Sequence, residues 1–232
     1  MYIENPKTAG SGILCAIPQT GRCPNGCNDC FFQSGRSYLE PLAEHLPNMP
    51  SAGQAEGFVV RVNDGNDSHH RQEEVMDACA YYRDKFYNTS CPDDLDLYDG
   101  PVVLTTNPGD RTDKHATLRC SKNLMAVRVR TNTWNLRIVQ DAINFYTPHT
   151  AVFLTFMAYH DLDDIPQSHR RNYTYRKRTL NEYWAIMPFA WREVMEEFAD
   201  YPWVYSCGEG GRSGCRQCGN CLREYFAWKV KQ

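Results

Sequence analysis

Six short apolar runs alternate along the 232-residue chain with segments of helical periodicity, and this alternation constrains the fold more than any other feature. The runs have the length and β-branched content of buried strands, and they lie at residues 12–18, 57–63, 101–107, 124–131, 150–159 and 202–206. Between them, apolar residues at spacings of three and four predict amphipathic helices at residues 71–87, 134–146 and 188–199. Strands that alternate with helices form βαβ units. The sequence therefore predicts an α/β fold around a parallel sheet.

Six strands are too few for a closed eight-stranded barrel, so we expect either a partial barrel or an open, doubly wound sheet. In both, ligand-binding groups gather at the carboxyl ends of the strands. A cysteine-rich loop follows the first predicted strand, NDGND (63–67) follows the second, and Cys207 follows the last. We therefore expect a binding site at this edge of the sheet.

Composition and charge limit where such a protein works. The net charge of -3 predicts no general attraction to nucleic acid or anionic membranes. No apolar run approaches the roughly 18 residues of a membrane span, and the first residues lack the apolar core of a signal peptide. We expect a cytoplasmic protein without a membrane partner. In a reducing cytoplasm, eleven cysteines favour metal binding over disulfides, although Cys15 and Cys79 lie in apolar or helical segments and are expected to be core residues.

The first cysteine group, CPNGCNDC, places Cys23, Cys27 and Cys30 in one short loop. Pro24 and Gly26 favour a turn that lets three sulfurs converge. Thiolates select iron–sulfur clusters, zinc or copper(I). Structural zinc takes four ligands, whereas three suit a four-iron cluster that leaves one iron open. The alternatives are a zinc site with a fourth ligand from elsewhere and cysteines that bind no metal.

This C-x3-C-x2-C loop after the first strand of an α/β chain resembles the signature of the radical S-adenosylmethionine superfamily. The resemblance implies a partial (β/α)6 barrel and a [4Fe–4S] cluster on Cys23, Cys27 and Cys30. It also implies that S-adenosylmethionine binds the open iron and is cleaved reductively to a 5′-deoxyadenosyl radical. An electron donor such as flavodoxin or ferredoxin is implied as a partner. Members of the superfamily usually carry an aromatic residue before the third cysteine, where this chain has Asp29.

The same resemblance implies which residues hold S-adenosylmethionine. Asn63, Asp64 and Gly65 occupy the place of the segment that holds the methionine amino group, which needs oxygen acceptors. Arg128, Arg130 and Asn132 alternate along the fourth predicted strand, where the superfamily contacts the ribose and the methionine carboxylate. The alternatives are a plain polar turn at 63–67 and a solvent-exposed face for the arginines.

The second cysteine group lies at the carboxyl end, with Cys207, Cys215, Cys218 and Cys221. Three cysteines that follow one another at three-residue spacing are typical of ferredoxins, and Cys207 completes four thiolates for a second [4Fe–4S] cluster. Zinc is the rival metal, although zinc ribbons use two separated C-x2-C pairs. The tail resembles the auxiliary-cluster extensions of some radical S-adenosylmethionine enzymes. We therefore divide the chain into a barrel, residues 1–206, and a short cysteine-rich extension, residues 207–232.

The sequence thus predicts a radical S-adenosylmethionine enzyme whose substrate, whether peptide, nucleotide or nucleic acid, is not specified. The alternative is a non-catalytic zinc-binding module that contacts nucleic acid through HRRNYTYRKR (169–178). This segment combines five cationic side chains with two tyrosines, which can meet phosphates and bases. A solvated loop or the start of a helix is the simpler interpretation of this segment, because the chain as a whole is slightly acidic.

Overall fold

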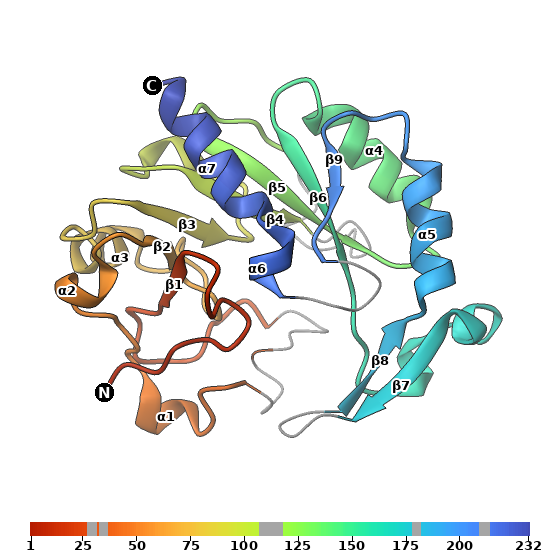
Figure 1. The fold of residues 1–232 in the computed structure, drawn as a ribbon, viewed down its shortest axis with the longest axis horizontal. Helices are drawn as coiled ribbons and strands as arrows, with labels where there is room; N and C mark the ends of the chain where they lie inside the picture. Colours follow the sequence, from red (N-terminus) through yellow and green to blue (C-terminus); the bar gives the residue numbers. More distant parts are fainter. Residues whose placement is uncertain (27–31, 33–36, 107–117, 178–181, 209–213) are drawn as a thin grey trace.

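Seven parallel strands form one sheet in a computed structural model that describes residues 1–26, 32, 37–106, 118–177, 182–208 and 214–232 (Figure 1). The strands are β1 (Ile13–Ala16), β2 (Val59–Val62), β3 (Lys85–Thr89), β4 (Val102–Thr106), β5 (Leu124–Thr131), β6 (Ala151–Phe156) and β9 (Val204–Ser206). They lie in consecutive order, and each pairs in parallel with the next. The α/β class and the parallel sheet are therefore confirmed.

The strand order excludes the doubly wound sheet, one of the two expected architectures. A doubly wound sheet reverses its strand order near the middle, and this sheet does not. The sheet is also open and has seven strands, so a closed barrel is not present. Each of the six predicted runs contains one strand, and β3 is the addition.

The predicted helix at 71–87 is wrong in its second half. Helix α3 spans only Gln72–Ala78, and Lys85–Thr89 form β3 between β2 and β4. Phe86 and Tyr87 are both fully buried, and as neighbours in a strand they face opposite sides of the sheet. Burial of both aromatic rings requires a strand with both faces covered, and this tertiary demand overrides the local helical pattern.

The other two predicted helices are confirmed as α4 (Leu136–Tyr146) and α5 (Pro188–Glu197). Pro188 stands in the first turn of α5, where no backbone donor is lost. Four further helices were not expected, and they are α1 (Leu42–His45), α2 (Ala52–Ala55), α6 (Cys215–Cys218) and α7 (Asn220–Val230). A separate antiparallel hairpin joins β7 (Tyr173–Lys177) and β8 (Glu182–Ile186). None of the helices in the described ranges is long and apolar enough to span a bilayer.

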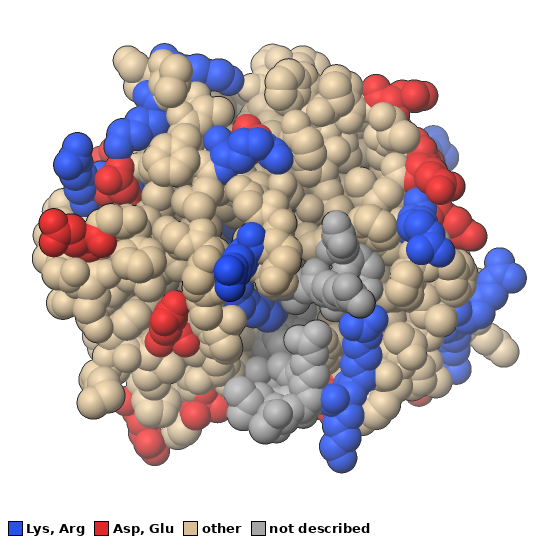
Figure 2. All heavy atoms as spheres, in the orientation of Figure 1, with Lys and Arg blue, Asp and Glu red and all other residues tan. Residues whose placement is uncertain are grey.

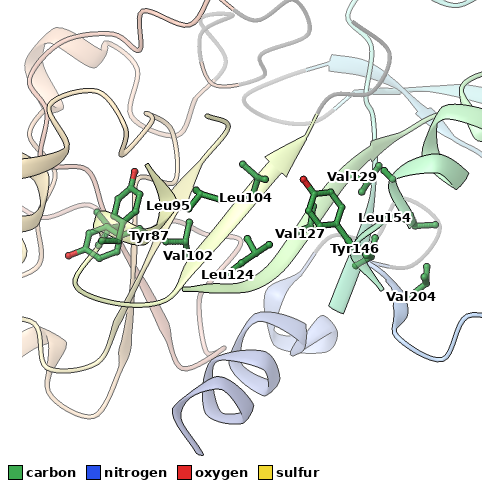
Figure 3. Close-up of a cluster of buried hydrophobic side chains, with 14 of the residues drawn as sticks. Tyr87, Leu95, Val102, Leu104, Leu124, Val127, Val129, Tyr146, Leu154 and Val204 are labelled. Carbon is green, nitrogen blue, oxygen red and sulfur yellow. The ribbon is translucent and has the colours of Figure 1, made fainter. Parts of the chain in front are cut away.

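Each face of the sheet has its own apolar core. On one face, the strands pack against α3, α4 and α5 through a cluster that includes Tyr87, Leu104, Val127, Tyr146 and Leu154 (Figure 3). Helix α7 covers the opposite face, where it lies across β4 and β5 (Figure 1). We call this second side the α7 face.

Helix α7 is fixed at the amino edge of the sheet. The Tyr225 hydroxyl donates to the Asp84 carboxylate at 2.9 Å, and Lys229 pairs with the same group at 2.5 Å. The Trp228 ring nitrogen donates to the Lys122 carbonyl at 3.2 Å. The helix therefore begins near the middle of the α7 face and ends at its amino edge, so the tail belongs to the core of the sheet.

Candidate functional site

The α7 face is apolar at the amino ends of the strands and polar at their carboxyl ends. The apolar half carries Ile13, Val59, Phe86, Val103, Ala126 and Ala151. Alternate residues of a strand share a face, so the next polar side chains on this face follow two or four positions later. They are Cys15, Arg61, Asn88, Thr105, Arg128, Arg130 and Thr155, and the strand register pairs Cys15 with Arg61, Thr105 with Arg128 and Arg130 with Thr155. We call this set the polar half of the α7 face.

Several buried polar atoms in and beside this polar half have no hydrogen-bond partner among the described residues. They are Arg61 Nε, Asn63 Oδ1, Arg130 Nη1 and Thr155 Oγ1. A buried polar atom without a partner costs about 1–3 kcal/mol, so such atoms are usually paired. Their concentration at the carboxyl ends of β2, β5 and β6 fits a polar ligand at the edge where parallel sheets bind ligands.

A chain of hydrogen bonds crosses the sheet at this level. The Asn88 amide nitrogen donates to the Asn63 carbonyl at 3.1 Å, and the Asn88 side-chain oxygen accepts from Arg128 Nη1 at 3.0 Å. Arg128 Nη2 donates to the sulfur of Cys221 at 3.3 Å. Burial is the largest single effect and lowers the pKa of Arg128, but the Cys221 and Cys207 sulfurs together raise it by more, so the net shift is upward. Asn88 thus connects the loop after β2 with the cysteine-rich tail.

Arg61 is the second arginine of the polar half and has a carboxylate partner. Its Nη2 lies 2.5 Å from Asp64 Oδ1, and Asp64 also accepts a hydrogen bond from Asn5. The same guanidinium donates to the sulfur of Cys15 at 3.3 Å and to that of Cys215 at 3.8 Å. Asp64, which we expected to contact a ligand, is therefore engaged by Arg61. Cys15 is buried as expected, but its sulfur faces this arginine.

Gly65 brings the first cysteine loop against the loop after β2. A Cβ on Gly65 would lie 2.1 Å from the ring of Phe32, which is two residues beyond Cys30. No real side chain fits at that distance, so the close approach requires glycine. Asn63 takes a left-handed backbone conformation with φ 62° just before it, and its amide donates to Ser68 at 2.9 Å.

Asp67 ties the first cysteine loop to the sheet, a role that we did not predict. Its carboxylate accepts hydrogen bonds from Asn25 Nδ2 at 2.8 Å, Thr89 Oγ1 at 2.6 Å and Ser90 Oγ at 2.6 Å. It also accepts from the backbone nitrogens of His69 and Ser90. Burial raises the pKa of Asp67, but these hydrogen bonds from Ser90, Thr89 and His69 lower it by more, so the net shift is downward.

Asn25 stands between Cys23 and Cys27, so this network holds the first cysteine loop directly. His70 also contacts it, with Nε2 at 2.6 Å from Asn25 Oδ1. Cys23 is half-buried, while Cys27 and Cys30 lie outside the described residues. A pocket opens beside Cys23 between the two loops, and its lining includes Gly21, Arg22, Pro24, Asn66 and His70.

The four tail cysteines lie at the start of the elements that cover the α7 face. Cys207 directly follows β9, Cys215 and Cys218 bound α6, and Cys221 is the second residue of α7. The thiol of Cys207 donates a hydrogen bond to Cys218, which lowers the pKa of Cys218 to about 5 and raises that of Cys207. Cys215 and Cys221 accept from Arg61 and Arg128. Cys215 and Cys221 therefore contact the polar half, while Cys207 and Cys218 interact with each other.

Within the described ranges, no three His, Cys, Asp or Glu side chains are arranged to hold one metal ion. The chemistry of the tail nevertheless suits a thiolate-bound metal. The hydrogen bond from Cys207 lowers the pKa of Cys218, and Arg128 faces the sulfur of Cys221 with no carboxylate partner among the described residues. A cation in that position needs nearby negative charge, which metal-bound thiolates supply.

Two other expected features lie away from this chemistry. Asn132 is buried in the turn after β5, where its backbone nitrogen donates to Asn135 and its side-chain oxygen accepts from Trp134, both at 2.9 Å. Residues 169–177 of the basic segment lie in a 3-10 helix (Gln167–Asn172) and then in β7, and Arg178 lies outside the described residues. Tyr173 is buried against Trp134, and Arg170 pairs with Asp163 at 2.7 Å. Lysine and arginine side chains are seen beside the β7–β8 hairpin in Figure 2.

Comparison of the chain with family models, with curated proteins and with solved structures found no match. The site therefore has to be interpreted from its own residues.

Proposed function

We propose that this chain is a radical S-adenosylmethionine enzyme that works in the cytoplasm with a one-electron donor such as flavodoxin or ferredoxin. In this proposal, the open sheet is a partial barrel and the α7 face is its inner side. Cys23, Cys27 and Cys30 hold the first [4Fe–4S] cluster. When bound, this cluster supplies the electron that cleaves S-adenosylmethionine to a 5′-deoxyadenosyl radical.

One observation carries the proposal: unpartnered buried polar atoms gather at the same edge of the sheet as the first cysteine loop. The Phe32–Gly65 contact and the Asn25–Asp67 hydrogen bond hold that loop against the loop after β2. A cofactor with an ammonium, a carboxylate and a hydroxylated sugar matches a site that offers both donors and acceptors.

The chain's own residues have distinct roles in this proposal. Arg130 Nη1 is the donor for the methionine carboxylate, and Asn63 Oδ1 is an acceptor for the amino group, because both atoms have no other partner among the described residues. Asp64 orients Arg61, and Gly65 lets Phe32 close over the loop. Arg128 reaches the tail sulfur, and Asn132 shapes the turn that follows β5.

The tail holds a second [4Fe–4S] cluster on Cys207, Cys215, Cys218 and Cys221 in this proposal, with zinc as the rival metal. Cys215 and Cys221 contact Arg61 and Arg128 of the polar half, and a hydrogen bond joins Cys207 to Cys218. Thiolate ligands suit either metal, so analysis of the bound metal decides between them.

The test is anaerobic purification followed by iron, sulfide and zinc analysis and by reduction with dithionite in the presence of S-adenosylmethionine. We expect a brown protein that forms 5′-deoxyadenosine. Replacement of Cys23, Cys27 and Cys30 by alanine should remove about four irons, since thiolates hold them, and abolish that product.

Cys120→Ala is the matched control, because Cys120 is exposed and lies in neither cysteine group. It should change neither the iron content nor the yield of 5′-deoxyadenosine. Formation of 5′-deoxyadenosine by the triple variant contradicts the assignment. A colourless protein with zinc at both sites supports the zinc-binding module instead.

A further inference from the structure

Two of the three arginines of the polar half, Arg61 and Arg128, contact cysteine sulfurs, and they differ in how their charge is balanced. Arg61 has a carboxylate at 2.5 Å, so its positive charge is compensated within the protein before any sulfur is considered. Arg128 donates to the neutral amide of Asn88 and to the sulfur of Cys221. Among the described residues, it pairs with no carboxylate.

A half-buried guanidinium without a counter-anion is unfavourable, because enclosure removes part of its hydration. The sulfur of Cys221 is the group that Arg128 reaches for compensation, and the Cys207 sulfur also lies near enough to influence it. Four thiolates around one metal centre carry the negative charge that this arginine lacks. Arg128 therefore lies beside the four cysteines as a cation. It cannot bind a metal itself, because a guanidinium stays protonated and has no acceptor atom.

We propose that Arg128 is a built-in counter-cation of the four-cysteine centre, and that its charge and its N–H···S hydrogen bond to Cys221 make a bound cluster easier to reduce. The inference rests on the second metal centre of the proposed function. Hydrogen bonds to the sulfurs and the net charge around a cluster are among the factors that set its reduction potential. A positive charge favours the state with one more electron.

The arrangement also predicts that changes at the partners of Arg128 and of Arg61 shift the reduction potential in opposite directions. A carboxylate beside Arg128 would cancel the positive charge of Arg128. Loss of the carboxylate beside Arg61 would leave the positive charge of Arg61 uncompensated. Asn88→Asp creates the first change, because Asn88 Oδ1 already accepts from Arg128 at 3.0 Å. Asp64→Asn creates the second, because Asp64 is the partner of Arg61.

The experiment uses the full chain with Cys23, Cys27 and Cys30 replaced by alanine, so that the tail centre alone is reconstituted with iron and sulfide. Dithionite supplies one electron to the centre, no bond is formed or broken, and the potential is measured by a redox titration followed by electron paramagnetic resonance. Arg128→Met should make reduction about tenfold less favourable, a decrease of about 59 mV for one electron. Arg137→Met, at an exposed position of α4, is the matched control and should leave the potential unchanged.

Asn88→Asp should lower the potential as Arg128→Met does, and Asp64→Asn should raise it. These two variants test the inference even where Arg128→Met does not fold or does not retain iron, because both still contain Arg61 and Arg128. Equal potentials in all variants, or shifts of Asn88→Asp and Asp64→Asn in the same direction, overturn the inference.

The outcome is separable from that of the proposed function. An intact chain that yields no 5′-deoxyadenosine, together with the predicted shifts at the tail, overturns the radical enzyme and leaves the role of Arg128 standing. Where the tail takes up zinc and no iron, the claim about reduction is wrong. The counter-cation is then tested by the affinity for Zn²⁺ alone, which should fall about tenfold in Arg128→Met and not in Arg137→Met; equal affinities overturn it.

Discussion

Cys23 lies half-buried in a loop at the carboxyl edge of the sheet, whereas Cys221 is a buried residue of α7 on the face of the sheet. The loop of Cys23 is held by uncharged hydrogen-bonding groups around one carboxylate, Asp67. Cys221 faces an arginine. The comparison teaches that one residue type stands in two settings here: Cys23 lies between residues that line a pocket, while Cys221 is buried and accepts a hydrogen bond from a cation.

The largest effect should come from breaking the enclosed group. Cys221→Ala removes the sulfur that accepts from Arg128, a hydrogen bond of a kind worth about 1.5–3 kcal/mol. Metal binding at such a site is also folding energy. We therefore expect the tail metal to be lost and the free energy of unfolding of the metal-loaded protein to fall by about 3 kcal/mol or more.

Cys23→Ala provides the contrast, and both variants are compared by metal analysis and urea unfolding. It should empty the loop site yet change the free energy of unfolding by less than about 1 kcal/mol, because Cys23 lies in a half-exposed loop. Iron at the loop site should survive in Cys221→Ala. Unchanged metal content and stability in that variant would show that Cys221 is not a ligand.

The carboxylate that holds the loop should have the next largest effect. Asp67→Asn removes the charge that five donors surround, which should lower the free energy of unfolding at pH 7 by about 2 kcal/mol. The pKa of Asp67 is lowered in the folded protein, so its contribution is present above the unfolded value of about 3.9 and is lost as the pH falls through the lower folded value.

The difference between the wild-type protein and Asp67→Asn should therefore shrink from pH 7 toward pH 3. Urea unfolding of the metal-free chain at several pH values measures it without interference from metal loss. Asp77→Asn, an exposed change in α3, should show little difference at any pH. A gap between wild type and Asp67→Asn that stays constant with pH would contradict the role of the carboxylate.

The sequence predicts six of the seven strands of the parallel sheet and misses β3. The six predicted strands are correct because each carries a two-sided apolar run, such as VVLTT in β4. Strand β3 is missed because KFYNT contains a lysine and an asparagine and directly follows a helical segment. Its aromatic rings are buried by contacts with residues far along the chain, which no local pattern contains.

The missed site residues have the same origin. Asn88 stands in the unrecognised strand, so its hydrogen bonds to Asn63 and Arg128 could not be expected. Asp67 belongs to NDGND, where a carboxylate looks like an ordinary turn residue. Arg61 could have been predicted as a site residue, because a cation inside the apolar run VVRV needs a buried partner. Cys221, Tyr225 and Trp228 recur at helical spacing and could have predicted α7.

Arg130 provides a test of the proposed binding site for S-adenosylmethionine. Its Nη1 has no partner among the described residues, unlike the nitrogens with which Arg128 contacts Asn88 and Cys221. Arg130→Ala should weaken binding of S-adenosylmethionine about tenfold or more, as for the loss of a charge-assisted pair worth ~1.5–3 kcal/mol. Calorimetric titration of the reconstituted protein measures it. Iron content should not change, and Arg137→Ala should bind as wild type does; equal affinity in Arg130→Ala would exclude the contact.

The smallest effect should come from the contact that joins the open loop to the sheet. Gly65→Ala places a Cβ 2.1 Å from the Phe32 ring, and a shift of the ring that relieves the contact should cost about 1 kcal/mol, the low end for overpacking. Gly53→Ala in α2 meets no atom within 4 Å and should be neutral or slightly stabilising, since alanine favours helix. In a Phe32→Ala background the ring is gone, so Gly65→Ala should become nearly neutral. A double-mutant cycle from urea unfolding measures this coupling. Additive effects of Gly65→Ala and Phe32→Ala would show that the first cysteine loop does not rest on Gly65, and the open site would then lack the contact that places it beside Asn63.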